Sequence, residues 1–60
     1  MGEPLRILLV DDEAPQRELI AGFLVKQGHE VLQAAGGAEA VARLRESRVD
    51  LVLSDCRMPG

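Results

Sequence analysis

Aromatic residues, cysteine and long apolar runs are scarce in this chain of 60 residues. Phe23 is its one aromatic residue, which leaves no platform for stacking nucleic-acid bases. The single Cys56 excludes an internal disulfide and fits a reducing compartment. No apolar run approaches the roughly 20 residues of a membrane span, and the first residues do not form a signal peptide. We therefore expect a cytoplasmic protein without membrane contact.

Positive charge is also limited. Ten acidic residues outnumber seven basic ones, for a net charge of −3. This balance argues against a nucleic-acid surface, which needs clustered Lys and Arg. A chain this short buries only roughly 60% of its unfolded surface, and no Cys/His cluster could hold a structural metal. We expect marginal stability, or support from more chain or a second copy.

Two short apolar runs each end in acidic residues. They cover residues 5–10 and 49–54, and such runs are typical of strands buried in a parallel sheet. Residues 29–34 are more polar, as expected for a strand at a sheet edge. The sequence therefore predicts three strands.

A first helix is predicted over residues 13–27. One face of it should carry apolar and amide side chains, namely Leu19, Ile20, Phe23, Leu24 and Gln27. Asp12 can cap its N-terminus, Pro15 is tolerated in the first turn, and Gly28 fits the left-handed position that ends a helix.

A second helix is predicted over residues 37–47. Its inner face should consist of Ala40, Val41 and Leu44. Glu39 and Arg43 are four residues apart and should form an ion pair on the outer face.

The order of elements is β-α-β-α-β. Right-handed crossovers place such strands parallel, with helices on the faces of the sheet. We expect an α/β fold with a parallel sheet, of which residues 1–60 look like the first half.

Three carboxylates follow the apolar strands, Asp11 and Asp12 after one and Asp55 after the other. If the strand order is 2-1-3, these strands are neighbours, and the carboxylates should converge at the sheet's carboxyl edge. Like charges so close repel unless a cation lies among them, and Mg²⁺ prefers such oxygen ligands, with Mn²⁺ as a substitute. A carboxylate beside Mg²⁺ can attack a phosphoryl group, which predicts aspartyl phosphorylation. An Asp after a strand can also be only a cap or turn residue.

Two stretches resemble the signature motifs of response-regulator receiver domains. They are Ile-Leu-Leu-Val-Asp-Asp-Glu at 7–13 and Asp-Leu-Val-Leu-Ser-Asp-Cys-Arg-Met-Pro-Gly at 50–60. The likeness is closest to receivers of NtrC-like transcriptional activators, which implies a role in transcription regulation. The resemblance also implies a flavodoxin-like, three-layer fold with strand order 2-1-3. It implies that Asp55 accepts the phosphoryl group and that Asp11, Asp12, Asp55 and the backbone carbonyl of Arg57 hold Mg²⁺. The implied phosphodonor is a histidine kinase or a phosphotransfer protein.

The resemblance also implies residues that the chain does not reach. The family places a Thr or Ser after a fourth strand and a Lys after a fifth, and this sequence stops at Gly60. Whether the chain catalyses its own phosphorylation is therefore left open. The alternative is a half-domain that acts only as a structural or oligomerising module, with copies pairing through residues 49–54. A haloacid-dehalogenase-like phosphatase is disfavoured because its motif requires Asp-x-Asp, whereas Asp11 and Asp12 are adjacent.

Overall fold

Strands and helices alternate along the chain. The structure, a computed structural model, describes residues 2–54. The elements are β1 (Arg6–Val10), α1 (Ala14–Lys26), β2 (Glu30–Ala34), α2 (Gly37–Glu46) and β3 (Leu51–Ser54). Each lies within the range that the sequence predicts for it.

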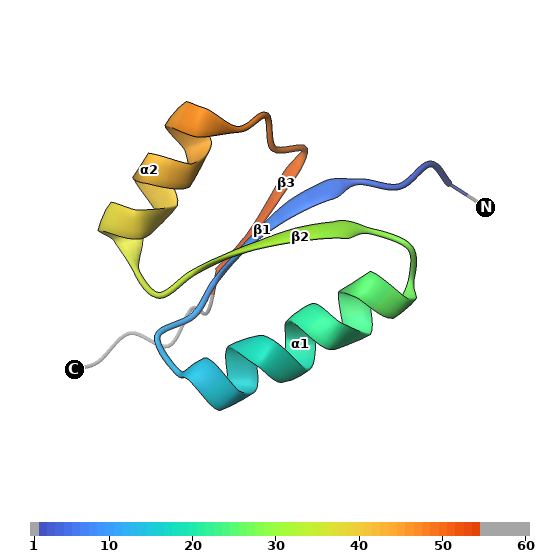
Figure 1. Ribbon diagram of the computed structural model, residues 1–60, viewed down its shortest axis with the longest axis horizontal. Helices are drawn as coiled ribbons and strands as arrows, with labels where there is room; N and C mark the ends of the chain where they lie inside the picture. The colour runs from blue at the N-terminus through green and yellow to red at the C-terminus, as the bar shows by residue number, and fades with distance from the viewer. Residues whose placement is uncertain (1, 55–60) are drawn as a thin grey trace.

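The three strands form one parallel sheet in the order β2-β1-β3, which confirms the predicted fold class. Val10 at the end of β1 pairs with Ala34 of β2 and with Ser54 of β3, so all three strands end at the same edge. The helices lie on opposite faces of the sheet (Figure 1). The reversal of strand order at β1 causes this, because each crossover must be right-handed.

The central strand supplies most of the core. Ile7, Leu8 and Leu9 of β1 are all buried. Leu8 packs with Ala34 of β2 and Ala40 of α2 in a small cluster. A strand that is apolar at consecutive positions is stable only when both of its faces are covered, and this is the situation of β1.

The ends of α1 differ in how well the sequence predicted them. The residue at the N-cap is Glu13, with no capping bond from its side chain, so the prediction that Asp12 caps the helix is wrong. The acid whose side chain instead bonds a backbone N–H at this end is Asp11, which accepts from Glu13. Pro15 lies in the first turn and Gly28 has a φ of 96°, both as predicted.

The buried face of α1 is only partly the predicted one. Ala21 is buried and Ile20 and Leu24 are half-buried, but Leu19 is 75% exposed and Phe23 61% exposed. The helix contacts β2 and β1 and no other described element. A sheet of three strands covers only one stripe of the helix, which leaves the apolar residues beside that stripe uncovered.

The same limit applies to α2. Ala40 is buried, but Val41 and Leu44 are half exposed, so the predicted inner face is wrong for these two residues. Among the described elements, α2 contacts only β2 and β1. Like α1, it does not reach β3. Glu39 and Arg43 do form the predicted ion pair, with 3.4 Å between Oε2 and Nη2.

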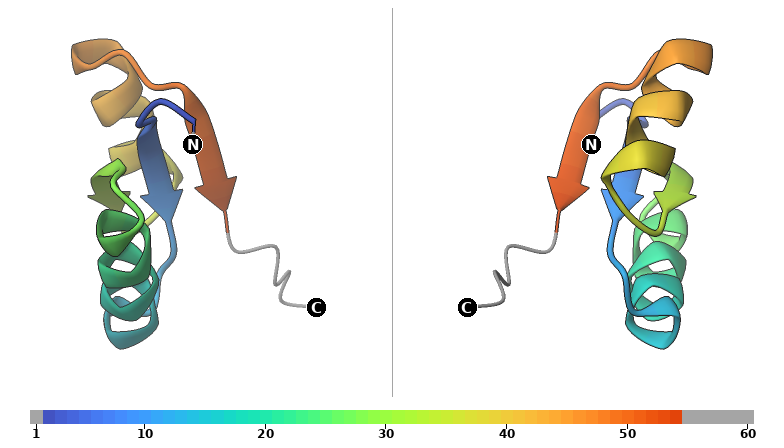
Figure 2. Two further views of the ribbon diagram at one scale, coloured as in Figure 1. Left: turned by 90° about the vertical axis from the view of Figure 1, so that its right-hand side faces the viewer. Right: turned by 90° about the vertical axis from the view of Figure 1, so that its left-hand side faces the viewer.

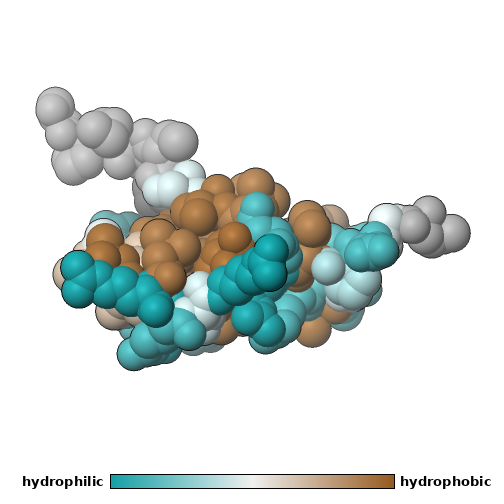
Figure 3. All heavy atoms as spheres, turned by 90° about the horizontal axis from the view of Figure 1, so that it is seen from above, coloured by the Kyte–Doolittle hydropathy of each residue, from teal (hydrophilic) through white to brown (hydrophobic). Residues whose placement is uncertain are grey.

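β3 is the least covered element. Within residues 2–54 it contacts β1 and neither helix. Figure 2 shows it at the edge of the sheet, away from both helices. Leu51 and Val52 are consequently 41% and 47% exposed. Figure 3, which looks down on the molecule, shows hydrophobic residues gathered in the middle of this view, with hydrophilic ones below them and towards both ends.

Candidate functional site

The loop between β1 and α1 carries the paired acids. Asp11 directly follows β1, and its backbone N–H donates to the carbonyl oxygen of Ala34 at 3.0 Å, which extends the ladder with β2 by one residue. This bond fixes the backbone of Asp11 at the carboxyl edge of the sheet. In open parallel sheets this edge, where the strand order reverses, is where ligands bind.

The Asp11 side chain is a buried carboxylate with defined partners. Its residue is only 3% exposed. Oδ1 accepts a hydrogen bond from the backbone N–H of Glu13 at 2.9 Å, and Oδ2 accepts one from Nε2 of Gln16 at 2.8 Å. Burial of a carboxylate is costly unless such bonds replace water, and the N-terminus of α1 adds a favourable dipole. The chain thus holds a negative charge in a fixed orientation at the end of the central strand.

Asp12 differs from its neighbour in exposure. Its residue is exposed, whereas Asp11 is buried. The pair therefore offers one oriented carboxylate and one that is open to solvent. Oxygen donors of this kind suit Mg²⁺, which retains several waters and needs few protein ligands.

Arg17 connects the loop of residues 11–13, here called the acid loop, with β2. Its Nη1 donates to the backbone carbonyl oxygen of Asp11 at 2.8 Å, and its Nε donates to Oε1 of Gln33 at 3.0 Å. Gln33 lies on β2, and its backbone carbonyl oxygen accepts a further bond from Nε of Arg43 at 3.2 Å. One guanidinium thus joins β2, α1 and the acid loop.

Sequence reasoning missed Gln16 and Arg17. Both lie in the opening turns of α1, five and six positions after Asp11. At that spacing a helix that starts just beyond an acid directs its first side chains back towards it. The sequence did offer a signal for these contacts: two polar residues at the start of a predicted helix that follows a strand ending in an acid.

Two of the predicted site residues, Asp55 and Arg57, lie outside the described residues. Within residues 2–54 no group of three or more His, Cys, Asp or Glu side chains could hold a metal ion. The predicted set needs Asp55 as its third carboxylate. The structure does bring the preceding residue, Ser54, into register with Val10, at the end of the strand that leads to the acid pair.

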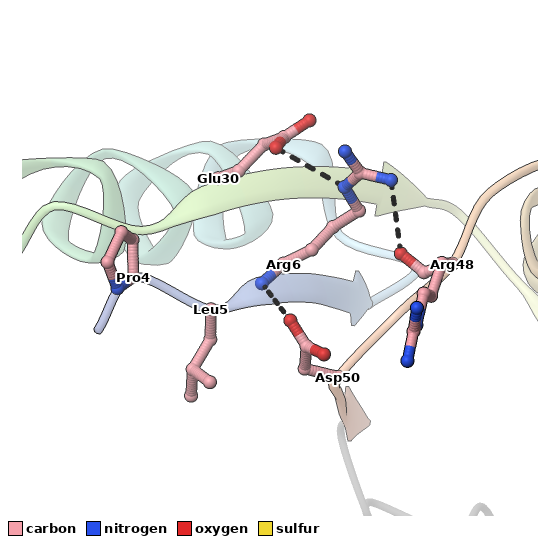
Figure 4. Close-up of a pocket in the computed structure, with 6 residues that line it drawn as sticks. All are labelled: Pro4, Leu5, Arg6, Glu30, Arg48 and Asp50. Atoms are coloured by element: carbon pink, nitrogen blue, oxygen red, sulfur yellow. Dashed lines mark hydrogen bonds and ion pairs between the residues drawn. The ribbon is translucent and has the colours of Figure 1, made fainter. Parts of the chain in front are cut away.

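The opposite edge of the sheet carries a different network (Figure 4). Arg6 donates its backbone N–H to Oδ2 of Asp50 at 2.8 Å, pairs with Glu30 at 3.2 Å, and donates Nη1 to the carbonyl oxygen of Arg48 at 3.3 Å. These residues line an open hollow of about 400 Å³. Two positive and two negative side chains balance there, so the network ties the strand starts together and does not select a charged ligand.

Comparison with known proteins decides which family this arrangement represents. The response regulator receiver domain matches residues 7–60. The chain belongs to this family. Receiver domains are modules of two-component systems whose general function is to accept a phosphoryl group, and they pair with histidine kinases or phosphotransfer proteins.

Individual relatives agree with the family assignment. The receiver is 49% identical to the chemotaxis protein CheY of Bacillus subtilis over 55 residues, which is 90% of this chain and 46% of that protein. It is 44% identical to the protein PilH of Pseudomonas aeruginosa, over 92% of this chain and 46% of that protein. The structure of the chemotaxis response regulator CheY4 of Vibrio cholerae superimposes with a TM-score of 0.85 at 37% identity, covering 95% of this chain and 48% of that one. The receiver thus spans about half the length of these relatives.

The relatives are diverse in kind. Transcriptional regulatory proteins and a sensor histidine kinase are 42–46% identical to the chain, close to the 49% of the chemotaxis protein. This spread supports the receiver family and does not specifically support a likeness to NtrC-like activators. In the part of the receiver that the structure describes, neither helix has the length and hydropathy needed to cross a bilayer.

Proposed function

We propose that this receiver accepts a phosphoryl group on Asp55 from a phosphohistidine donor, assisted by Mg²⁺. A carboxylate oxygen of Asp55 attacks phosphorus, the P–N bond breaks, and the histidine of the donor leaves with a proton. The cation would neutralise charge on the phosphoryl oxygens during transfer. A histidine kinase or a phosphotransfer protein in the cytoplasm would supply the group.

The buried and oriented carboxylate of Asp11 carries this proposal. Besides the backbone N–H of Glu13, which a simple cap or turn acid would also accept, the Asp11 carboxylate is held by Gln16 on its second oxygen and is only 3% exposed. Asp55 is covalently attached to Ser54, which pairs with the residue before Asp11. Asp11, Asp12, Asp55 and the backbone carbonyl of Arg57 would then hold Mg²⁺, or Mn²⁺ in its place.

The experiment is phosphorylation of the intact chain with acetyl phosphate and Mg²⁺, followed by intact-mass measurement. We expect the mass to increase by one phosphoryl group in the native sequence and not in Asp55→Ala. Glu46→Gln, which alters an exposed acid at the end of α2, is the control and should behave like the native sequence. Binding of the beryllofluoride mimic should be lost with Asp55→Ala in the same way. Unchanged labelling in Asp55→Ala would refute the assignment.

A second function is supported by the exposure of β3. The strand contacts neither helix in the described chain and exposes Leu51 and Val52. Exposed apolar edge strands pair readily with other chains. Under this alternative the chain is an oligomerising module that pairs β3 with β3 of a second copy across a two-fold axis. Absence of phosphorylation together with self-association in sedimentation would favour it.

The output of the receiver is a finer question. The sequence Arg57-Met58-Pro59-Gly60 supports a role in transcription regulation through its likeness to NtrC-like activators. Fusion of the receiver's parent gene to a DNA-binding output domain would support this assignment. Fusion to a kinase, as the names of some relatives indicate for them, would contradict it.

A further inference from the structure

Gln16 connects the first turn of α1 with the Asp11 carboxylate. Its Nε2 donates to Oδ2 at 2.8 Å, while the other oxygen, Oδ1, accepts the Glu13 backbone N–H at 2.9 Å. A carboxylate offers about four lone-pair sites, two on each oxygen. These two bonds use one site on each oxygen, so a cation would bind at the remaining sites.

The two bonds have different effects on orientation. The terminal torsion of an Asp side chain is soft and broadly distributed, so a bond to one oxygen alone leaves the carboxylate plane free to turn. The backbone N–H of Glu13 supplies that first bond and is present whatever the side chains are. The bond from Gln16 holds the second oxygen and thereby fixes the plane.

The amide of Gln16 can serve this purpose without being part of the core. The residue is exposed, and the hydrogen bond itself is only partly buried. Its amide nitrogen must face Asp11, because an amide oxygen there would meet a negatively charged acceptor. The contact therefore contributes orientation to the acid site more than it contributes packing to the fold.

We infer that Gln16 is a positioning residue that holds the Asp11 carboxylate in the orientation needed to bind a divalent cation. The inference rests on the proposed Mg²⁺ site. Hydrogen-bonding partners of metal-binding carboxylates typically change metal affinity by about 10- to 100-fold when they are removed. The lower end is expected here, because the Glu13 N–H still holds one oxygen of Asp11 in place when Gln16 is replaced.

The experiment measures Mg²⁺ binding to the full chain by titration calorimetry, without a phosphodonor. Gln16→Met removes the donor but keeps the length and helix propensity of the side chain. Gln27→Met makes the same change at the far end of α1 and is the matched control. We expect Gln16→Met to bind Mg²⁺ about 10-fold more weakly than the native chain, and Gln27→Met to bind it equally well.

Binding is compared at a temperature where circular dichroism shows every variant fully folded, so that a loss of stability does not enter the affinity. A weaker affinity under that condition supports the positioning role, because a merely structural contact would leave the folded chain's affinity unchanged. Equal or tighter binding by Gln16→Met overturns the inference and leaves the proposed function standing. A native chain that binds no Mg²⁺ overturns both.

Discussion

Arg17 donates Nη1 to the backbone carbonyl oxygen of Asp11 at 2.8 Å, so a side chain of α1 holds the backbone of the acid that follows β1. The same guanidinium reaches Gln33 on β2 through Nε at 3.0 Å. Together with Gln16, which holds the carboxylate, Arg17 makes the start of α1 a support for the acid loop. The position of Asp11 thus depends on α1, the helix that follows it in the chain.

Replacement of Arg17 by Met should lower the free energy of unfolding. The change removes the bonds to Asp11 and Gln33, and a hydrogen bond contributes about 0.5–1.5 kcal/mol net. We expect a loss of about 1–2 kcal/mol in urea denaturation followed by circular dichroism. Arg45→Met, on the exposed face of α2, is the control and should change stability by less than about 0.5 kcal/mol. Equal effects of the two changes would show that the Arg17 bonds do not stabilise the fold.

The glycines of the first crossover should respond to alanine in opposite directions. Gly28 has a φ of 96°, where a side chain is strained, so Gly28→Ala should destabilise the chain by about 1 kcal/mol or more. Gly22 lies inside α1, and an added Cβ there meets no atom within 4 Å. Gly22→Ala should therefore stabilise the chain by up to about 1 kcal/mol. Thermal unfolding of the two variants measures both signs, and shifts in the same direction would contradict the backbone geometry.

The exposed apolar residues of α1 should tolerate polar substitution. Leu19 is 75% exposed, so Leu19→Gln should change the free energy of unfolding by less than about 0.5 kcal/mol. Leu8 is fully buried, and Leu8→Ala should cost about 2–5 kcal/mol, which would unfold much of a chain this small. Urea denaturation distinguishes the two cases. A large loss from Leu19→Gln would mean that more chain or a second copy covers this side of α1.

A charge on β3 should test the oligomerising alternative. Val52 is 47% exposed on a strand that contacts only β1 among the described elements. If copies pair through this strand, Val52→Lys should shift sedimentation towards the monomer, because a lysine on an edge strand disfavours pairing. Val41→Lys, on α2 and exposed to a similar extent, is the control. A native chain that sediments as a monomer at high concentration would contradict the alternative directly.

Some features of this receiver follow from the sequence alone. Periodic apolar residues identified the three strands and the two helices, and right-handed crossovers made the strands parallel. The order 2-1-3, which the structure confirms, came from the resemblance to receiver domains. The Glu39–Arg43 pair and the positive φ of Gly28 were also predicted, since each depends only on residues close in sequence. Local chemistry decides such features.

Other features were decided only by the tertiary structure. Which of the adjacent acids is buried depends on how α1 lies against β1, and Asp11 rather than Asp12 proved to be the one. Sequence periodicity marked Leu19 and Phe23 as buried because it shows which residues are apolar and not how far the sheet extends beneath them. The polar pair Gln16 and Arg17 is visible in the sequence, but its bonds to Asp11 depend on where the axis of α1 lies relative to β1. Long-range packing sets these positions, and no local pattern encodes it.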